Sequence, residues 1–382
     1  MFDFLSSNSS DFIKSIEDLN SSQIGSSVKF YNEINSDEHF DFMLICINES
    51  RGNFDKQGQI DFETLKHQFY KLNKGNWRLS ILDMGEVYAG SEISDTYFAV
   101  KTLVKYALKQ KSIPIVLGGS QDLLYYQYRA YDGFKYMVNL VNIDFKFDLG
   151  DSNIPLHHES FLSHMVVNKP YNLFNFANLG YQTFLNTQEE IILLEKMFFE
   201  AYRLGEMTSE IKKVEPVLRD ADLVSIDMRC IESQSLAQDN LFPNGYNNRE
   251  ICALSRYAGL SDKVSSLGIY ELQYLESNVS KELVAQMLWY FVEGVKYRLN
   301  EKADVENPNL IKYQVPVDED ILVFYESQLS GRWWIEIPSN FENVNNKLKQ
   351  HSLLPCDKEN YLSACNQELP ERWIKARKKN EC

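Results

Sequence analysis

The chain is poor in positive charge. Its 39 Lys and Arg residues stand against 54 Asp and Glu residues, which gives a formal net charge of −15 over 382 residues. Nucleic acid and anionic membrane surfaces are bound through clustered cationic side chains, so this balance argues against both as partners. The composition favours a small molecule or a protein as the partner.

Cysteine pairs and long apolar runs are also missing. The opening MFDFLSSNSSDF lacks the basic start and apolar run of a signal peptide, and no apolar stretch approaches the length of a membrane span. We therefore expect a cytoplasmic protein. No CxxC pair occurs, so neither a zinc knuckle nor a disulfide framework is indicated by the six cysteines, which are Cys46, Cys230, Cys252, Cys356, Cys365 and Cys382.

What the sequence does contain is an alternation of strand-like and helix-like segments. Apolar, branched runs of strand length predict strands at 39–48, 79–84, 113–117, 136–143, 223–227 and 264–271. Apolar residues at helical spacing predict helices at 62–72, 94–110, 189–204, 210–219 and 281–298. Such alternation predicts a three-layer α/β fold, in which helices cover both faces of a mainly parallel sheet.

The pattern changes near residue 300. Two or three short antiparallel strands are expected in 311–337, followed by the polar stretch 341–350 and a last helix ending in KARKKNEC. We divide the chain into an N-terminal extension (1–37), an α/β domain (38–299) and a β-rich appendage (300–382). Trp333, Trp334 and Trp373 are candidate anchors for a protein partner or a second subunit. Neighbouring strand residues point to opposite faces, so one ring of the Trp333-Trp334 pair could pack on the core while the other stays available; the alternative is that both are buried.

Polar residues follow three of the expected strands. The segments are IPIVLGGSQD, VNIDFKFDLG and LVSIDMRCIE. In parallel sheets the ligand site lies beyond the carboxyl ends of the strands. These residues are therefore the first candidates for a functional site.

The three strand ends resemble motifs of the ureohydrolase family, which includes arginases, agmatinases and formimidoylglutamases. The family's Gly-Gly-Asp-His-Ser, Asp-x-His-x-Asp and Ser-x-Asp-x-Asp motifs supply six manganese ligands. This chain has Gln121, Lys146 and Arg229 where the family has two histidines and an aspartate. Three carboxylates remain of the six ligands, and they are Asp144, Asp148 and Asp227.

Other segments extend the resemblance over roughly residues 38–298. ICINESRGN resembles the family's Gly-x-Pro-x-x-x-Gly turn, and LDMGEV resembles its Asp-x-Gly-Asp segment. LGIYELQY matches the strand end where the family places a substrate-binding glutamate, here Glu271. HHESFL resembles the segment that carries a His-Gly proton shuttle, so His158 is its counterpart, with His157 as the alternative. The chain is most similar to a branch identified as formimidoylglutamase-like in Bacteroidetes-type bacteria.

Charge decides how the altered site is interpreted. Three aspartates facing Lys146 and Arg229 sum to about −1, and two divalent ions would leave about +3 in a partly dehydrated site. Unit charges a few ångströms apart repel by about 4 kcal/mol per pair at an effective dielectric of 20. We predict a salt-bridge cluster and no cofactor. In the alternative with Mn²⁺, the ligands would be the three aspartates.

For several of these side chains the sequence allows a second position or role. Lys146 could instead reach solvent from a surface loop, and Arg229 could point outward if the strand register slips by one residue. Gln121 and Asp122 are expected only to cap the helix that follows them. His158 and Glu271 could be structural or could touch a ligand. If Lys146 neutralises buried aspartates, Lys146→Ala should cost on the order of 3 kcal/mol.

Two function classes follow. The favoured one is a non-catalytic ureohydrolase-fold protein that serves in protein interaction or scaffolding. The alternative is a hydrolase that cleaves a linear amidine C–N bond, as in N-formimidoylglutamate, with metal-activated hydroxide; carbamylated Lys146 would then supply an anionic ligand. A metal-free sensor of a small amidine or amine also stays open.

Overall fold

The main body is built on one large sheet. The computed structural model describes residues 2–33, 38–134, 136–238, 241–301, 303–338 and 353–381. In this part of the chain ten strands follow the order β1-β4-β3-β5-β10-β9-β6-β7-β8, with β2 beside β4. Every pair is parallel except β1 with β4. The strands are β1 (Leu5–Ser6), β2 (Val28–Phe30), β3 (Phe42–Asn48), β4 (Ile81–Tyr88), β5 (Ile113–Gly118), β6 (Val138–Ile143), β7 (Leu173–Tyr181), β8 (Glu200–Arg203), β9 (Leu223–Asp227) and β10 (Ser266–Tyr270).

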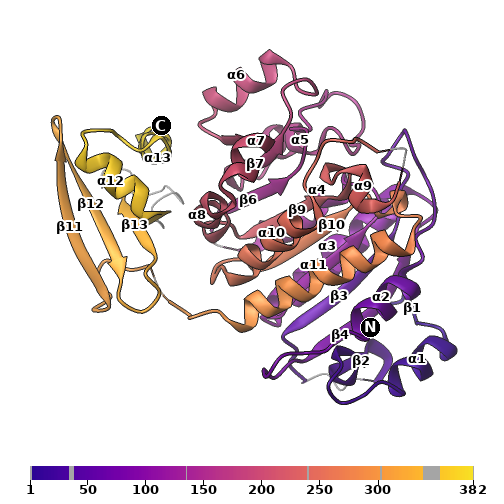
Figure 1. The fold of residues 1–382 in the computed structure, drawn as a ribbon. Helices are drawn as coiled ribbons and strands as arrows, with labels where there is room; N and C mark the ends of the chain where they lie inside the picture. Colours follow the sequence, from indigo (N-terminus) through magenta and orange to yellow (C-terminus); the bar gives the residue numbers. More distant parts are fainter. Residues whose placement is uncertain are drawn as a thin grey trace.

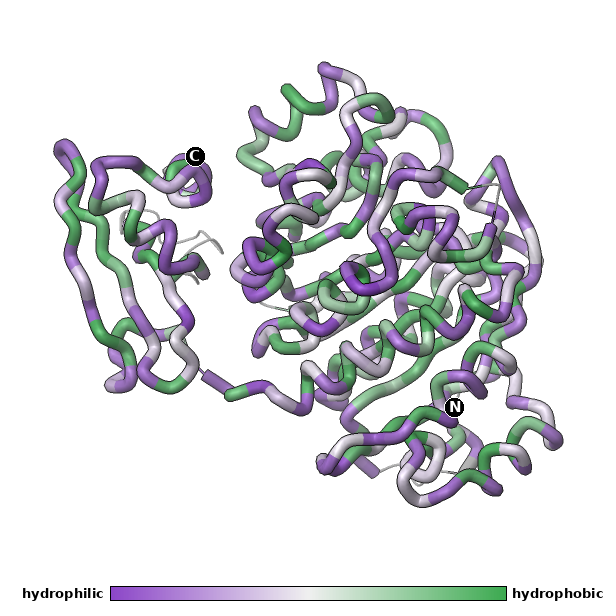
Figure 2. The backbone as a smooth tube through the Cα atoms, viewed as in Figure 1, coloured by the Kyte–Doolittle hydropathy of each residue, from purple (hydrophilic) through white to green (hydrophobic). Residues whose placement is uncertain are grey.

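Helices cover both faces of this sheet (Figure 1). Alternate residues of β3 enter different cores, since Leu44 and Cys46 belong to one cluster and Met43 and Ile45 to the other. The first cluster includes α2 (Phe62–Tyr70), α10 (Asn248–Leu260) and α11 (Asn278–Lys296); the second includes α3 (Ile93–Lys109), α4 (Leu123–Arg129) and α5 (Phe161–Val167). Figure 2 shows hydrophobic segments along the central strands between these layers. The predicted three-layer α/β fold is confirmed.

The expected segments match the main elements unevenly. All six predicted strands are present, with ends shifted by a few residues. The predicted helix 189–204 is wrong in its second half, because α6 (Gln188–Lys196) ends before Phe198, which has a left-handed φ of 55°, and β8 follows. The remaining helices are short: α1 (Ser10–Glu17), α7 (Leu204–Ser209), α8 (Glu215–Arg219) and α9 (Ser233–Leu236). None of the described helices is long and apolar enough to cross a membrane.

A second, antiparallel sheet follows α11. Its strands pair in the order β11 (Leu310–Val317), β12 (Asp320–Ser327), β13 (Trp333–Glu336) and β14 (Leu353–Cys356). The helices α12 (Lys358–Cys365) and α13 (Glu371–Glu381) pack with it. We call these elements together the C-terminal sheet. The expected antiparallel strands are confirmed, whereas the predicted polar stretch 341–350 and Cys382 lie outside the described residues.

The C-terminal sheet is docked on the core through buried polar contacts. Arg219 of α8 donates from Nη2 to the carbonyls of Trp333 (3.0 Å) and Cys356 (2.8 Å), and its guanidinium lies 4.6 Å from the centre of the Trp334 ring. Arg372 of α13 pairs with Glu200 of β8 at 2.6 Å. These contacts join α8 and β8, the last strand of the main sheet, to the C-terminal elements. In Figure 1, α8 lies on the side of the core that faces the C-terminal sheet.

The tryptophans expected to anchor a partner are buried within this chain. Trp333, Trp334 and Trp373 are 5%, 3% and 3% exposed. Trp333 and Trp334 do point to opposite faces, but both faces are covered: Trp333 stacks on Tyr313 and Tyr361, and Trp334 meets Arg219. The expectation of a free ring is therefore wrong.

Candidate functional site

The predicted site residues meet at one edge of the main sheet. Gln121 follows β5, Asp144 follows β6, Asp227 ends β9, and Glu271 follows β10. These four strands are neighbours in the order β5-β10-β9-β6, so their carboxyl ends lie side by side. We call the group formed by Gln121, Asp144, Asp148, Asp227, Arg229 and Glu271 the strand-end cluster.

Arg229 points into this cluster and holds Asp227. Its Nε lies 3.2 and 3.0 Å from the two carboxylate oxygens of Asp227, and its Nη2 lies 2.7 Å from Oδ2. The backbone N–H of Arg229 also donates to Asp227 Oδ1 at 2.7 Å. Nη2 is 3.8 Å from Glu271 Oε1, and the guanidinium lies 5.3 Å from the centre of the Phe145 ring. The alternative in which Arg229 points outward is excluded.

Gln121 donates its side-chain amide to Asp144. Nε2 lies 2.9 Å from Asp144 Oδ2 and 3.0 Å from Asn142 Oδ1, while Asn142 donates to the same Asp144 oxygen at 3.0 Å. Asp122 makes no side-chain cap for α4 and instead accepts a 2.6 Å hydrogen bond from the Tyr97 hydroxyl. The expectation that Gln121 and Asp122 only cap a helix is therefore wrong.

Lys146 turns away from the aspartates. Its Nζ pairs with Glu159 Oε1 at 2.5 Å, and 28% of its side chain is exposed. Only its backbone N–H reaches the cluster, by donating to Asp144 Oδ1 at 3.0 Å. The predicted pairing of the Lys146 ammonium with buried aspartates is wrong, because a flexible four-carbon stem reaches a partly solvated carboxylate with a smaller loss of hydration.

Asp148 is the least satisfied member of the cluster. It is 3% exposed, has a left-handed φ of 55°, and neither carboxylate oxygen has a hydrogen-bond partner among the described residues. Burial, with the nearby Asp144 carboxyl, raises the pKa of Asp148 well above its usual value. Burial and Asp227 raise the pKa of Asp144 to about 7.

Glu271 is fixed by three hydrogen bonds. It has a φ of 63° and accepts from the Gln121 backbone N–H at 2.9 Å, from Asn53 Nδ2 at 2.7 Å and from Gln273 Nε2 at 2.6 Å. Burial raises its pKa to about 7, although Arg229 acts in the opposite direction. A glutamate held this firmly has a structural role in the cluster whether or not a ligand reaches it.

His158 lies at the border of the cluster. Its Nδ1 is 3.1 Å from the Gly52 carbonyl oxygen, while Nε2 is buried without a hydrogen-bond partner among the described residues. The Asp55 and Glu159 carboxylates lie 3.9 and 3.8 Å from Nε2. Burial, then the charge of Arg229, lowers the pKa of His158. His157, the alternative, instead packs on Phe54, with 5.1 Å between ring centres.

Three residues of the site were not predicted from the sequence. Asn142 lies near the end of β6, two positions before Asp144, a spacing that could have identified it. Asn53 lies within the turn ICINESRGN, and Glu159 directly follows His158. For Asn53 and Glu159 no local signal indicated the partner.

These donors do not fit two divalent manganese ions. Both oxygens of Asp227 are engaged by Arg229, and both oxygens of Asp144 accept from amide or backbone N–H groups. Of the three aspartates only Asp148 keeps unpaired oxygens among the described residues, and Gln121 Oε1 is also unpaired. Across the described ranges, no group of three or more His, Cys, Asp or Glu side chains is placed to hold a metal ion. The fixed guanidinium also adds repulsion to any cation placed beside it.

The comparison with known proteins agrees with the fold. Formiminoglutamase of Trypanosoma cruzi, solved with manganese, superposes with a TM-score of 0.60 at 17% identity, covering 68% of this chain and 94% of that one. Formimidoylglutamase of Bacillus subtilis gives 0.64 at 14% identity, covering 78% and 97%. Agmatine ureohydrolase of Thermoplasma volcanium gives 0.55 at 16% identity, covering 74% and 97%.

Sequence comparison gives a family but no individual relative. No curated protein sequence matches the chain. The Arginase family model matches residues 59–292, which is more than half of the chain and includes all members of the strand-end cluster. This chain belongs to the arginase family.

Proposed function

We propose that this arginase-family protein does not perform manganese-dependent hydrolysis and acts as a non-catalytic interaction or scaffold protein. The observation that carries the proposal is the Arg229–Asp227 pair, with two guanidinium nitrogens on one carboxylate at 2.7 and 3.0 Å. Arginine cannot lose its proton to become a ligand. Two of the three aspartates at the family's ligand positions are thus neutralised or hydrogen-bonded within the chain.

The interaction role needs a surface other than the tryptophans. The C-terminal sheet begins after residue 292, where the match to the Arginase family model ends. Its exposed apolar side chains are Ile311 (38%), Leu362 (49%), Leu329 (64%) and Ile321 (66%). These side chains are the part of the appendage that a protein partner or a second copy could cover.

The proposal is tested by rebuilding the ligand set. The triple variant Gln121→His, Lys146→His, Arg229→Asp restores the ligand types of the family motifs around Asp144, Asp148 and Asp227. We expect the wild type to bind no manganese stoichiometrically by elemental analysis and calorimetry, and the triple variant to gain binding. Adding Asp148→Asn to the triple variant is the matched control and should remove the gain. Chelator-removable manganese in the wild type, with hydrolysis of formimidoylglutamate, arginine or agmatine, would refute the proposal.

The second candidate is a hydrolase that cleaves a linear amidine C–N bond, as the family's enzymes act on such bonds. The observation in its favour is the retained pair of His158 and Glu271, with the His158 Nε2 lone pair unengaged beside the cluster. A neutral imidazole nitrogen could accept a proton from water. The same assays decide: hydrolysis that is abolished by His158→Asn would establish this candidate.

A further inference from the structure

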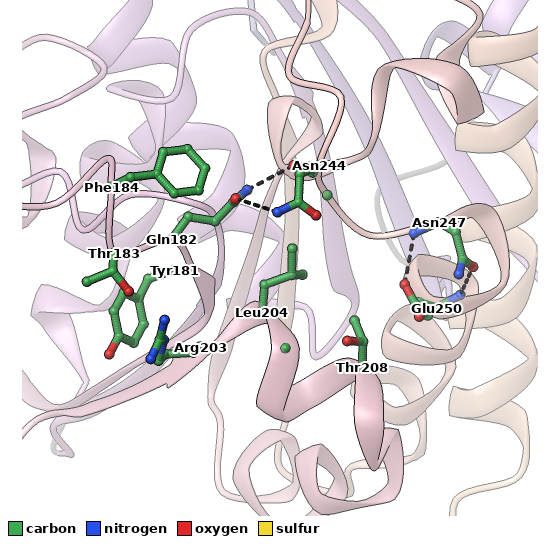
Figure 3. A pocket seen from close by; sticks show the side chains of 12 residues that line it. Tyr181, Gln182, Thr183, Phe184, Arg203, Leu204, Thr208, Asn244, Asn247 and Glu250 are labelled. Carbon is green, nitrogen blue, oxygen red and sulfur yellow. Dashed lines mark hydrogen bonds between the residues drawn. The ribbon is translucent and has the colours of Figure 1, made fainter.

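A cavity of about 420 Å³ opens at the carboxyl ends of β7 and β8, beyond β6 and apart from the strand-end cluster. Three segments form its walls (Figure 3). The first is Tyr181–Phe184 after β7, the second is Arg203 with the first turns of α7, and the third runs from Asn244 to the start of α10. Its volume lies within the roughly 300–1,000 Å³ typical of small-molecule sites.

Two of the walls are held in place by reciprocal hydrogen bonds. Gln182 donates from Nε2 to the Asn244 carbonyl at 2.9 Å, and Asn244 donates from Nδ2 to Gln182 Oε1 at 3.0 Å. Asn247 and Glu250 form a capping box, with the Asn247 N–H donating to Glu250 Oε2 at 2.9 Å. The cavity is therefore preformed, and one carboxylate oxygen of Glu250 is already engaged.

The unengaged groups on the side of the cavity opposite Glu250 include hydrogen-bond donors, whereas Glu250 keeps one free carboxylate oxygen on its own side. Arg203 forms no ion pair with any described residue, and Figure 3 shows its guanidinium beside the Tyr181 ring at the opposite side from Glu250. The hydroxyls of Thr183 and Thr208 also line the space. A planar guanidinium that faces a cavity matches a carboxylate, which it can bind through two parallel N–H···O bonds.

An aromatic wall lies next to this cation. Phe184 is 70% exposed although it lines the cavity, and the half-buried Tyr181 ring is fixed by Phe147, 4.8 Å away between ring centres. Covering an exposed aromatic ring with a flat apolar group removes its surface from water. We propose that the cavity binds a small organic carboxylate, with the carboxylate on Arg203 and a flat apolar part against Phe184. This inference holds for either function considered above.

The test uses benzoate and its neutral isostere benzamide on the full chain, by calorimetry and ligand-observed NMR. We expect benzoate to bind at one site and benzamide to bind at least about ten-fold more weakly. Arg203→Met should weaken the binding of benzoate by a similar factor, and Arg203→Lys should weaken it by less. Phe184→Ala should also lower the affinity for benzoate measurably. Arg249→Met is the matched control, because Arg249 is an exposed arginine near the cavity that does not line it. The Arg249→Met variant should bind benzoate with the affinity of the wild type.

Arg203 is exposed, so its substitution should leave the melting temperature unchanged and keep the binding result interpretable. Equal binding of benzoate and benzamide, or full affinity in Arg203→Met, would overturn the site. Inorganic phosphate that binds as tightly as benzoate, with no effect of Phe184→Ala, would overturn the assignment of an organic ligand.

Discussion

Arg229 and Asp227 form a buried ion pair at the end of β9, in which Nε (3.0 Å) and Nη2 (2.7 Å) of the arginine donate to the same carboxylate oxygen. Both side chains are buried, so removing one partner leaves the other charge uncompensated. Arg229→Met should therefore lower the free energy of unfolding by about 3–5 kcal/mol. Urea denaturation at pH 7 measures this loss. The double variant Asp227→Asn, Arg229→Met should recover part of it, and a stable Arg229→Met protein would contradict the pairing.

Lys146→Ala should cost less than about 1 kcal/mol, because the ammonium pairs with Glu159 in a partly solvated setting. A double-mutant cycle with Glu159→Gln measures the coupling between the two side chains. A loss near 3 kcal/mol that Glu159→Gln does not share would mean that the lysine reaches the buried aspartates instead.

Asp148→Asn should increase stability at alkaline pH. Burial raises the pKa of Asp148 above the ordinary value of 3.8, so the folded state binds this proton more tightly than the unfolded state. The contribution of the Asp148 carboxyl to the free energy of unfolding is fully present below about pH 4 and is lost as the pH rises toward the pKa of the folded state. Between pH 5 and pH 8 the wild type should lose more stability than Asp148→Asn, as followed by thermal unfolding. Parallel pH profiles would show that Asp148 has a partner when folded.

The pair between Glu200 and Arg372 should make the C-terminal contact acid-sensitive. Burial opposes ionisation of Glu200, but Arg372, together with Tyr202 and Asn175, outweighs it and lowers the pKa from 4.5 to about 2. The ionised Glu200 carboxylate therefore contributes about 3 kcal/mol to the free energy of unfolding; this contribution is present above pH 4.5 and is lost as the pH falls toward 2. Glu200→Gln should be less stable than the wild type at pH 6, and this difference should shrink at pH 3. A constant difference would contradict the assignment.

Removing residues 305–382 should leave a core that aggregates. Arg219 would lose both carbonyl acceptors, and Glu200 would lose Arg372. Size-exclusion chromatography and circular dichroism of the truncated chain report the result. A monomeric, folded core would instead make the C-terminal sheet an independent docking module.

The sequence predicted the central strands because they are buried on both faces and are therefore continuous apolar runs. It failed after Lys196, where apolar residues continue at helical spacing but Phe198 adopts a left-handed conformation that no local pattern encodes. The resemblance to the family motifs, together with their place at strand ends, correctly predicted that Gln121, Asp144, Asp227 and Arg229 lie at one sheet edge. The direction of each side chain could not be predicted, since it depends on partners far along the chain.

Glu159 and Asn53 illustrate this limit. Glu159 decides where Lys146 points, although it belongs to a loop 13 residues later, and Asn53 binds Glu271 across 218 residues. The tryptophans show the same limit in another form. Alternation along β13 correctly placed Trp333 and Trp334 on opposite faces, but it carries no information on what covers each face.

The contacts of Arg219 have a consequence for biosynthesis. Its two acceptors, the carbonyls of Trp333 and Cys356, lie 114 and 137 residues later in the chain. A ribosome that adds about 5–20 residues per second delivers this arginine many seconds before its partners. During that interval Nη2 of Arg219 lacks both acceptors, while Glu215, 3.4 Å from Nε, is already present in the core. We expect the nascent core to be less stable until the last strands arrive.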